Sequence, residues 1–189
     1  MVKTLVWNVH SILGNIRLET FLQFLSDNSI MLAFISETWL DSESGVFSRR
    51  LKKLSFQITH AFRENKSGGG TAIIHHESLA GKKWKASCSQ FQSFEYSGVF
   101  FANILVCCIY RKQEISIDTF CEEFDRFLLG IGSFKVVIGG DFNVWIDEDF
   151  DLEKEKLLNL MHNHGFFNRV FEPTHIGGHT LDQLYVNPY

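Results

Sequence analysis

Long hydrophobic runs are missing from this chain, and so is a strong positive charge. No apolar segment approaches the roughly 18 to 20 residues needed to cross a bilayer, and the start "MVKTLVWNVHSILGN" lacks the features of a secretory signal. The formal net charge is -4, which is unlike the strongly basic composition of most nucleic-acid binders. A local basic patch such as Lys82, Lys83 and Lys85 can still act in an acidic chain. We expect an intracellular protein, cytosolic or nuclear, with no membrane contact.

Cysteine is also scarce. The four cysteines, Cys88, Cys107, Cys108 and Cys121, form no CxxC pair and no spacing typical of a zinc site. Cys107 and Cys108 are adjacent, so in a strand their side chains would point to opposite faces of the sheet. We expect reduced, structural thiols.

The chain has only two prolines and no internal repeat, low-complexity segment or linker. Its 189 residues, of which 45% are hydrophobic, are enough for one good core, so we expect a single domain over residues 1–189. Alternating strand and helix patterns run along it. The expected strands are 4–9, 31–36, 56–63, 68–76, 91–98, 99–111, 134–140 and 179–187, and the expected helices carry apolar stripes at 18–25, 117–128 and 157–164.

The connections between these elements indicate the fold class. Helices join some strands, whereas turn residues alone separate the strands in the middle of the chain. This mixture of crossovers and hairpins predicts an α/β layered sandwich, in which two mixed sheets pack face to face and helices cover the outside.

Polar residues stand at the ends of five expected strands, where loops expose functional groups that the sheet holds rigidly. They are Asn8, Glu37, Tyr110, the pair Asp141 and Asn143 after "VVIGG", and Asp182 in "HTLDQL". The set combines carboxylates, amides and a phenol without a thiolate. Hard oxygen ligands of this kind suit Mg²⁺, or alternatively Mn²⁺, and metal-assisted hydrolysis of a phosphoester uses all of these groups.

Each residue also has a simpler structural interpretation. Asn8 fits a turn, Glu37 fits the first acidic residue of a following helix, and Tyr110 fits a strand edge with its hydroxyl in water. "GGDFN" fits an Asx turn, although two glycines also allow a close approach and alternation places Asp141 and its amide neighbour on one side. Asp182 lies between leucines and needs a partner in either case.

The order of "WNV", "SETWL", "IYR", "GGDFNV" and "HTLDQL" resembles the endonuclease/exonuclease/phosphatase superfamily. Within it, "SETWL" and "EPTHIGGHTLDQLYV" are similar to the apurinic-endonuclease-like domain of non-LTR retrotransposons. The resemblance covers nearly the whole chain. It implies the four-layered, DNase I-like α/β sandwich and a Mg²⁺-dependent endonuclease that nicks target DNA, leaving a 3′-hydroxyl that primes a reverse transcriptase, which could be part of the same polypeptide.

The same resemblance implies roles for individual residues. Glu37 would be the main metal ligand with Asn8 beside it, Asp141 would position or activate water, and Asn143 and Tyr110 would contact the scissile phosphate. Asp182 would orient a catalytic histidine. Further substrate contacts would come from other residues of these motifs, namely Arg111, Thr174 and His179.

The family's catalytic histidine lies in a Ser-Asp-His motif after a further strand, and this sequence ends at "YVNPY" before such a motif. We expect that strand, its terminal acid and its histidine to be missing here. Losing one such group lowers rates by about 10²- to 10⁴-fold. No other histidine stands in the right motif, and the candidates are interpreted as loop and strand-end residues: His75, His76, His175 and His179.

Two alternatives to an active endonuclease stay open at this level. One is a truncated or domesticated remnant that keeps the fold and a binding or structural role. The other is a sugar or lipid phosphatase of the same superfamily, because one scaffold hosts several substrates. The sequence carries no readable preference for a DNA target and no indication of oligomeric state.

Overall fold

The computed structural model describes residues 2–41, 45–63, 68–86, 90–175 and 177–187. Its helices are α1 (Asn15–Asp27), α2 (Gly45–Lys53), α3 (Ile117–Ile131), α4 (Leu152–Asn163) and the short 3₁₀ helix η1 (Glu77–Leu79). Its strands are β1 (Thr4–Asn8), β2 (Leu32–Ser36), β3 (Phe56–Ala61), β4 (Thr71–His76), β5 (Lys82–Trp84), β6 (Phe94–Phe101), β7 (Ile104–Arg111), β8 (Lys135–Asp141), β9 (Phe167–Asn168) and β10 (Asp182–Asn187).

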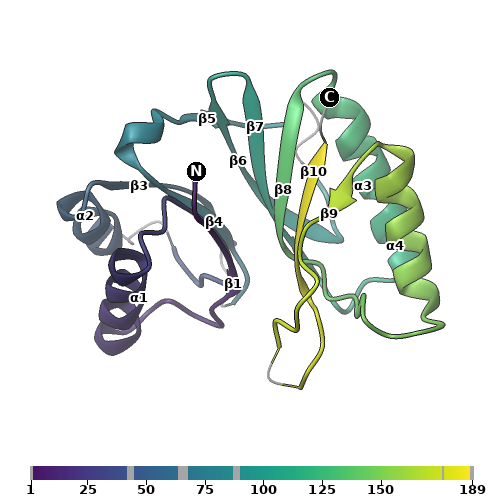
Figure 1. Ribbon diagram of the computed structural model, residues 1–189, viewed down its shortest axis with the longest axis horizontal. Coiled ribbons are helices and arrows are strands. Elements are labelled where there is room, and N and C mark those ends of the chain that lie inside the picture. The colour runs from purple at the N-terminus through teal and green to yellow at the C-terminus, as the bar shows by residue number, and fades with distance from the viewer. Residues whose placement is uncertain (1, 42–44, 64–67, 87–89, 176, 188–189) are drawn as a thin grey trace.

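The strands form two mixed sheets that pack face to face. One sheet has the order β1-β2-β4-β3 and the other the order β5-β6-β7-β8-β10-β9. In Figure 1 the layers follow one another from left to right, with α1 and α2 outside the first sheet and α3 and α4 outside the second. The prediction of an α/β sandwich with four layers is confirmed. None of the described helices is long and apolar enough to cross a membrane.

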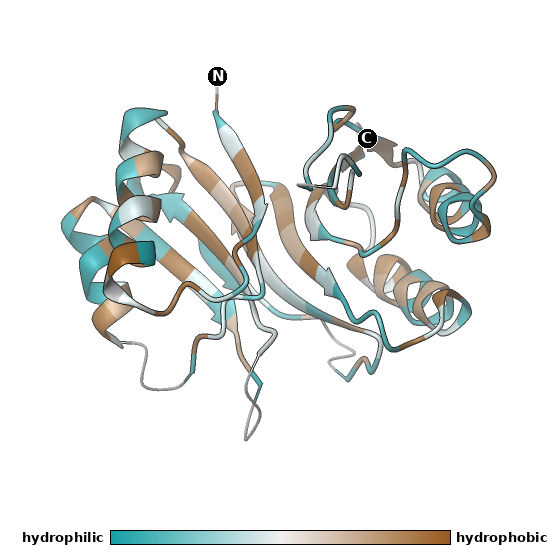
Figure 2. Cartoon of the chain, turned by 90° about the horizontal axis from the view of Figure 1, so that it is seen from below, coloured by the Kyte–Doolittle hydropathy of each residue, from teal (hydrophilic) through white to brown (hydrophobic). Residues whose placement is uncertain are grey.

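Three hydrophobic clusters hold these layers together. One lies between α1, α2 and the first sheet, where the predicted stripe of α1 is buried: Leu18, Phe21, Leu22 and Leu25. A second, rich in phenylalanine, joins α3 and α4 to the other sheet. The third lies between the sheets and includes Phe34 and Val106. Hydrophobic residues accordingly colour much of the central strands in Figure 2, and polar residues gather on the outer helix faces and loops.

The adjacent cysteines of β7 behave as their alternation predicts. Cys107 belongs to the cluster under α3, and Cys108 belongs to the cluster between the sheets. Both thiols are buried and free, and Cys121 is free as well. Cys88 lies outside the described residues. Burial raises the pKa of Cys108 to about 12, so this thiol is protonated and unreactive at neutral pH.

Some boundaries differ from the sequence-based expectation. The expected strands 91–98 and 99–111 are instead β6 and β7, which form a hairpin that turns at Ala102 and Asn103. Ala102 has a left-handed φ of 53°, a conformation that a periodicity argument does not reveal. The helix α2 was not expected either, because it is only 9 residues long and buries only Phe47 and Leu51, which is too short a pattern to identify a helix.

Candidate active site

A pocket of about 510 Å³ opens at one end of the sandwich. Side chains from the first sheet, Asn8 and Glu37, line one side, and residues of the second sheet line the other: Asp141, Asn143 and Asp182. The structure therefore brings together six of the predicted site residues, because Thr174 lines the same pocket. They lie on or next to strands of both sheets, and some of them are more than a hundred residues apart in the sequence.

The strand registers explain this convergence. In the first sheet β1 runs parallel to β2, and Asn8 is opposite Ser36, the residue before Glu37. In the second sheet β7 runs parallel to β8, whereas β10 is antiparallel to β8 and begins with Asp182 opposite Asp141. Parallel strands end at the same edge, and an antiparallel neighbour starts there, so the polar ends meet at one edge.

Asn8 connects the two sides of the pocket. Its side-chain amide nitrogen donates to the Glu37 carboxylate at 2.9 Å and to the Asp141 carboxylate at 2.7 Å. Its side-chain oxygen accepts the backbone N–H of His10 at 3.0 Å, which is an Asx turn. The turn interpretation of Asn8 is therefore correct, and the same turn directs its amide group toward the two carboxylates.

Asp141 and Asn143 are arranged in a similar way. The backbone N–H of Asn143 donates to Asp141 Oδ1 at 2.8 Å, forming the Asx turn considered for "GGDFN". β8 ends at Asp141, and Asn143 has a left-handed φ of 50°, so the turn rather than strand alternation places both side chains in the pocket. Glu37 also has a left-handed φ, of 52°. Such strained backbone in non-glycine residues gathers at functional sites.

The two glycines before Asp141 allow the backbone of β8 to pack closely against its neighbours. A Cβ on Gly139 would meet the Phe34 ring at 2.7 Å, and one on Gly140 would lie 1.9 Å from the Ile109 carbonyl oxygen. The close approach predicted at "GG" is therefore an approach to the opposite sheet and to β7, and neither glycine lines the pocket.

The pocket concentrates negative charge in a poorly solvated place. Burial raises the pKa of Asp141, the nearby Glu37 raises it further, and hydrogen bonds from Asn8 and Asn143 partly offset this. Burial and then the charge of Asp141 raise the pKa of Asp182 to about 7. Among the described residues, Asp182 Oδ1 is buried without a hydrogen-bond partner. A cation in the pocket would satisfy this oxygen and lower the repulsion between the carboxylates.

Tyr110 and Arg111 end β7 but have different surroundings. Tyr110 is half-buried and hydrogen-bonds Glu37, and burial followed by the Glu37 charge raises the pKa of its phenol. It is therefore not a solvated strand-edge residue. Arg111 is only 3% exposed and donates to the carbonyls of Asn143 and Ile115. The structure does not bring Arg111 into the pocket, because its guanidinium supports the loop that carries Asn143.

The segment before β10 contributes Thr174 but not His179. The Thr174 hydroxyl accepts the backbone N–H groups of Leu181 and Asp182 at 3.0 and 2.9 Å, and Thr174 lines the pocket. His179 instead stacks on Trp145 with ring centroids 4.3 Å apart, and its Nδ1 lies 3.0 Å from Asp147. Asp147, Glu148 and His179 form a separate group of possible metal ligands outside this pocket.

His175 is a pocket residue that sequence reasoning set aside. It occupies a loop, as predicted, yet it lines the pocket beside Asp141 and Asp182. Its Nδ1 accepts the backbone N–H of Gly177 at 3.1 Å, so the other ring nitrogen, Nε2, is the one that could contact a ligand. His175 lies within the stretch "EPTHIGGHTLDQLYV" that carries the family resemblance, but that stretch does not reveal the direction of its side chain, which depends on the hairpin that closes through hydrogen bonds from Thr174 and His175 to the His179 carbonyl.

Fold and pocket together define a two-sheet α/β sandwich with a hard-oxygen acidic site at one sheet edge. The sequence matches the Endonuclease/Exonuclease/phosphatase family over residues 5–188, and the chain belongs to this family. A comparison with curated proteins finds no significant sequence match.

Solved structures show the same fold at low sequence identity. An AP endonuclease from Archaeoglobus fulgidus matches with a TM-score of 0.75 and 18% identity, covering 100% of this chain and 87% of that one. The 3′ phosphatase NExo from Neisseria, bound to a product DNA hairpin, gives 0.66 and 16%, covering 99% and 86%. The endonuclease domain of TRAS1, a telomere-specific non-LTR retrotransposon, gives 0.64 and 14%, covering 87% and 75%.

Proposed function

We propose that this chain is a Mg²⁺-dependent DNA endonuclease domain that hydrolyses one phosphodiester bond and leaves a nick. The observation that carries the proposal is the bridge from Asn8 to Glu37 and Asp141, which joins the polar ends of both sheets in one pocket. Neighbouring structures that act on DNA or belong to a retrotransposon support the substrate class and a role in target nicking. That role implies a nuclear location and a partner reverse transcriptase.

The donor atoms fit a hard divalent cation. Glu37, Asp141 and Asp182 offer carboxylate oxygens, and a positive charge is needed at Asp182 Oδ1, which is buried without a hydrogen bond from the residues that the structure describes. Mg²⁺ would be held chiefly by Glu37 with Asn8 beside it, and Mn²⁺ would suit the same ligands. When bound, such an ion stabilises charge on the phosphate and lowers the pKa of water.

The protein groups have separate tasks in hydrolysis. Asp141 accepts a proton from the attacking water, and its raised pKa makes it a better base than an exposed carboxylate. The bond between phosphorus and the 3′-oxygen breaks, and the departing 3′-oxygen takes a proton from solvent water to become the 3′-hydroxyl. The Asn143 side-chain amide and the protonated Tyr110 phenol donate hydrogen bonds to phosphate oxygens. Asn143 Nδ2 donates to the Arg111 carbonyl at 2.6 Å before substrate binds, so its second N–H would serve the phosphate.

A plasmid-nicking assay tests this function. The unaltered chain should convert supercoiled plasmid to nicked circles in Mg²⁺ but not in EDTA, and a polymerase should extend the nicks directly because they carry 3′-hydroxyls. Glu37→Gln should lower the rate by about 10²-fold or more. The control Glu122→Gln changes the same side chain on the exposed face of α3 and should leave the rate unchanged.

Other outcomes point to the two alternatives. If the unaltered chain does not nick DNA but hydrolyses phosphoinositides or sugar phosphates in Mg²⁺, the chain is a phosphatase of the same family. If nothing is hydrolysed, the binding or structural remnant is the better description.

A further inference from the structure

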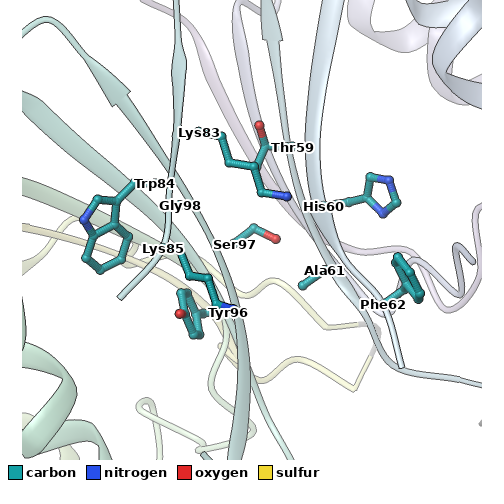
Figure 3. Close-up of a pocket in the computed structure, with 10 residues that line it drawn as sticks. All are labelled: Thr59, His60, Ala61, Phe62, Lys83, Trp84, Lys85, Tyr96, Ser97 and Gly98. Atoms are coloured by element: carbon teal, nitrogen blue, oxygen red, sulfur yellow. The ribbon is translucent and has the colours of Figure 1, made fainter. Parts of the chain in front are cut away.

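A hollow of about 500 Å³ lies on the flank of the sandwich, between the outer strands of the two sheets. Figure 3 shows residues of β3 on one side, including His60, and residues of β5 and β6 on the other, including Lys83. The rings of Trp84 and Tyr96 pack against the core cluster under α3. The labelled groups therefore do not converge on one ligand, in contrast to those of the acidic pocket at the strand ends.

Gln113 lines the acidic pocket beside Asn143, although it stands outside the motifs "IYR" and "GGDFNV". Its side-chain amide nitrogen, Nε2, donates to Asn143 Oδ1 at 2.7 Å. Gln113 is exposed, so it is not held by packing in the core. Keeping a long exposed side chain in one orientation costs rotamer entropy, which the hydrogen bond to Asn143 offsets. The contact therefore belongs to the site and not to the core.

The turn between β7 and α3 presents Gln113 to the pocket. The backbone N–H of Ile115 closes this turn by donating to the Lys112 carbonyl at 3.4 Å. The backbone N–H of Lys112 donates to the Ser93 carbonyl at 2.9 Å, which anchors the turn to the segment before β6. The Arg111 guanidinium donates to the Ile115 carbonyl at 3.1 Å and anchors its other end. The backbone that carries Gln113 is therefore fixed relative to β7.

The hydrogen bonds around Asn143 determine which end of its side-chain amide faces which neighbour. A backbone carbonyl only accepts, so the atom 2.6 Å from the Arg111 carbonyl is the amide nitrogen Nδ2. Asn143 Oδ1 then faces Gln113, which must donate through its own amide nitrogen. Both polar atoms of the Asn143 side chain are therefore held, and its second N–H has one direction.

A fixed N–H is what the proposed hydrolysis requires of Asn143. Its backbone is already constrained, because its N–H donates to Asp141 Oδ1 at 2.8 Å and its φ is 50°. The side-chain amide could still rotate about its last bond and exchange its donor and acceptor ends. The Arg111 carbonyl disfavours that rotated state, and Gln113 stabilises the observed one by donating to Oδ1. A donor that is oriented in advance needs no reorganisation during the reaction.

We propose that Gln113 is a positioning residue, which locks the Asn143 side-chain amide so that its second N–H points at the scissile phosphate. Gln113 acts through Asn143 and does not itself touch the reacting atoms. The proposal rests on the endonuclease function proposed above and adds to it a residue outside the motifs. The contact can be measured without metal, substrate or cleavage.

The first measurement follows the side-chain NH₂ group of Asn143 by NMR in EDTA, and its signals are identified as those missing from Asn143→Asp. Gln113→Met removes the donor but keeps the length of the side chain. It should shift these signals and speed their exchange with water by about threefold or more. The matched control Glu114→Met places the same side chain at the next, equally exposed position of the turn and should leave the signals unchanged.

The second measurement is the kinetics of plasmid nicking in Mg²⁺. Gln113→Met should lower kcat by about tenfold and change KM by about twofold at most, because Gln113 affects orientation and not DNA binding. Gln113→Lys keeps a donor of similar reach and should recover most of kcat, and Glu114→Met should match the parent. In Asn143→Ala, adding Gln113→Met should have no further effect, since the residue that it positions is gone.

Two results would overturn the proposal. One is an Asn143 side-chain signal that does not change in Gln113→Met. The other is an equal loss of kcat when Gln113→Met is made in the parent and in Asn143→Ala, because Gln113 would then act independently of Asn143. If the signals shift in Gln113→Met but the parent nicks no DNA, the positioning contact is supported and the endonuclease function is contradicted, so the two failures are distinguishable.

Discussion

Asn8 and Asp141 combine two roles that sequence reasoning treated as alternatives. In each residue one side-chain oxygen accepts the hydrogen bond of an Asx turn, which fixes the side chain. The remaining polar side-chain atom, Nδ2 of Asn8 or Oδ2 of Asp141, takes part in the hydrogen bond between the two sheets. A residue held by a local turn loses little further freedom when it binds a ligand. Glu37 differs from its helix-start interpretation, because α2 begins only at Gly45 and the intervening backbone turns left-handed at Glu37.

Asp182 gives a prediction about pH. Its folded-state pKa of about 7 lies above the ordinary 3.8, so the folded protein binds more protons than the unfolded chain between these values. The free energy of unfolding should therefore fall as pH rises through this window, by up to about 4 kcal/mol. Asp182→Asn removes the titrating group and should be more stable than the parent at pH 8 in EDTA, but not at pH 4.

Urea denaturation of both proteins at the two pH values measures this difference. The control Asp149→Asn changes an exposed aspartate in the turn before α4 and should follow the parent at both pH values. If the stability of the parent and of Asp182→Asn changed in parallel with pH, this would contradict the raised pKa that burial gives the Asp182 carboxyl.

At the scale of elements, the pairing of β7 with β8 positions the pocket. Within this pairing, Gly140 is the residue at which a larger side chain should be least tolerated. Gly140 has a φ of 143°, and a Cβ there would overlap the Ile109 carbonyl. Gly140→Ala should lower the free energy of unfolding by about 3 kcal/mol or more. Gly165→Ala, at another positive φ but with nothing within 4 Å, should cost only about 1 kcal/mol.

Urea unfolding of the two alanine variants gives this comparison. Equal losses would mean that backbone conformation alone, rather than the contact with β7, sets the cost at Gly140.

The elements also show what the sequence could and could not predict. The buried face of α1, the extent of α3 and the opposite orientations of Cys107 and Cys108 follow from periodicity, which depends only on local geometry. The short strands β5 and β9 carry too few apolar residues for such a signal, and their pairing partners create them.

The candidate site was also predictable only in part. Motif order identified the polar strand ends that meet in the pocket. It also suggested Arg111 and His179, and set aside His175. These differences depend on side-chain direction: β7 turns Arg111 inward, and the hairpin before β10 turns His175 toward the pocket and His179 toward Trp145. One sequence contains no signal for such directions.

For the whole molecule, the pocket is divided between two sheets, so a bound ion should hold them together. Mg²⁺ at about a hundred times its dissociation constant should stabilise the fold by about 2.7 kcal/mol, measured as a rise in Tm. Glu37→Gln should lose most of this gain, and Glu122→Gln should keep it. An equal rise in Tm for both variants would place the ion elsewhere, for example at Asp147, Glu148 and His179.

The most direct test of the proposed function is the rate at which Asp141→Asn nicks supercoiled plasmid in Mg²⁺, compared with Asp118→Asn. Both variants replace a carboxylate by an amide of the same size, one in the pocket and one on the outer face of α3. The endonuclease proposal predicts a loss of about 10²-fold or more for Asp141→Asn and none for Asp118→Asn. Equal nicking by the two variants would contradict it.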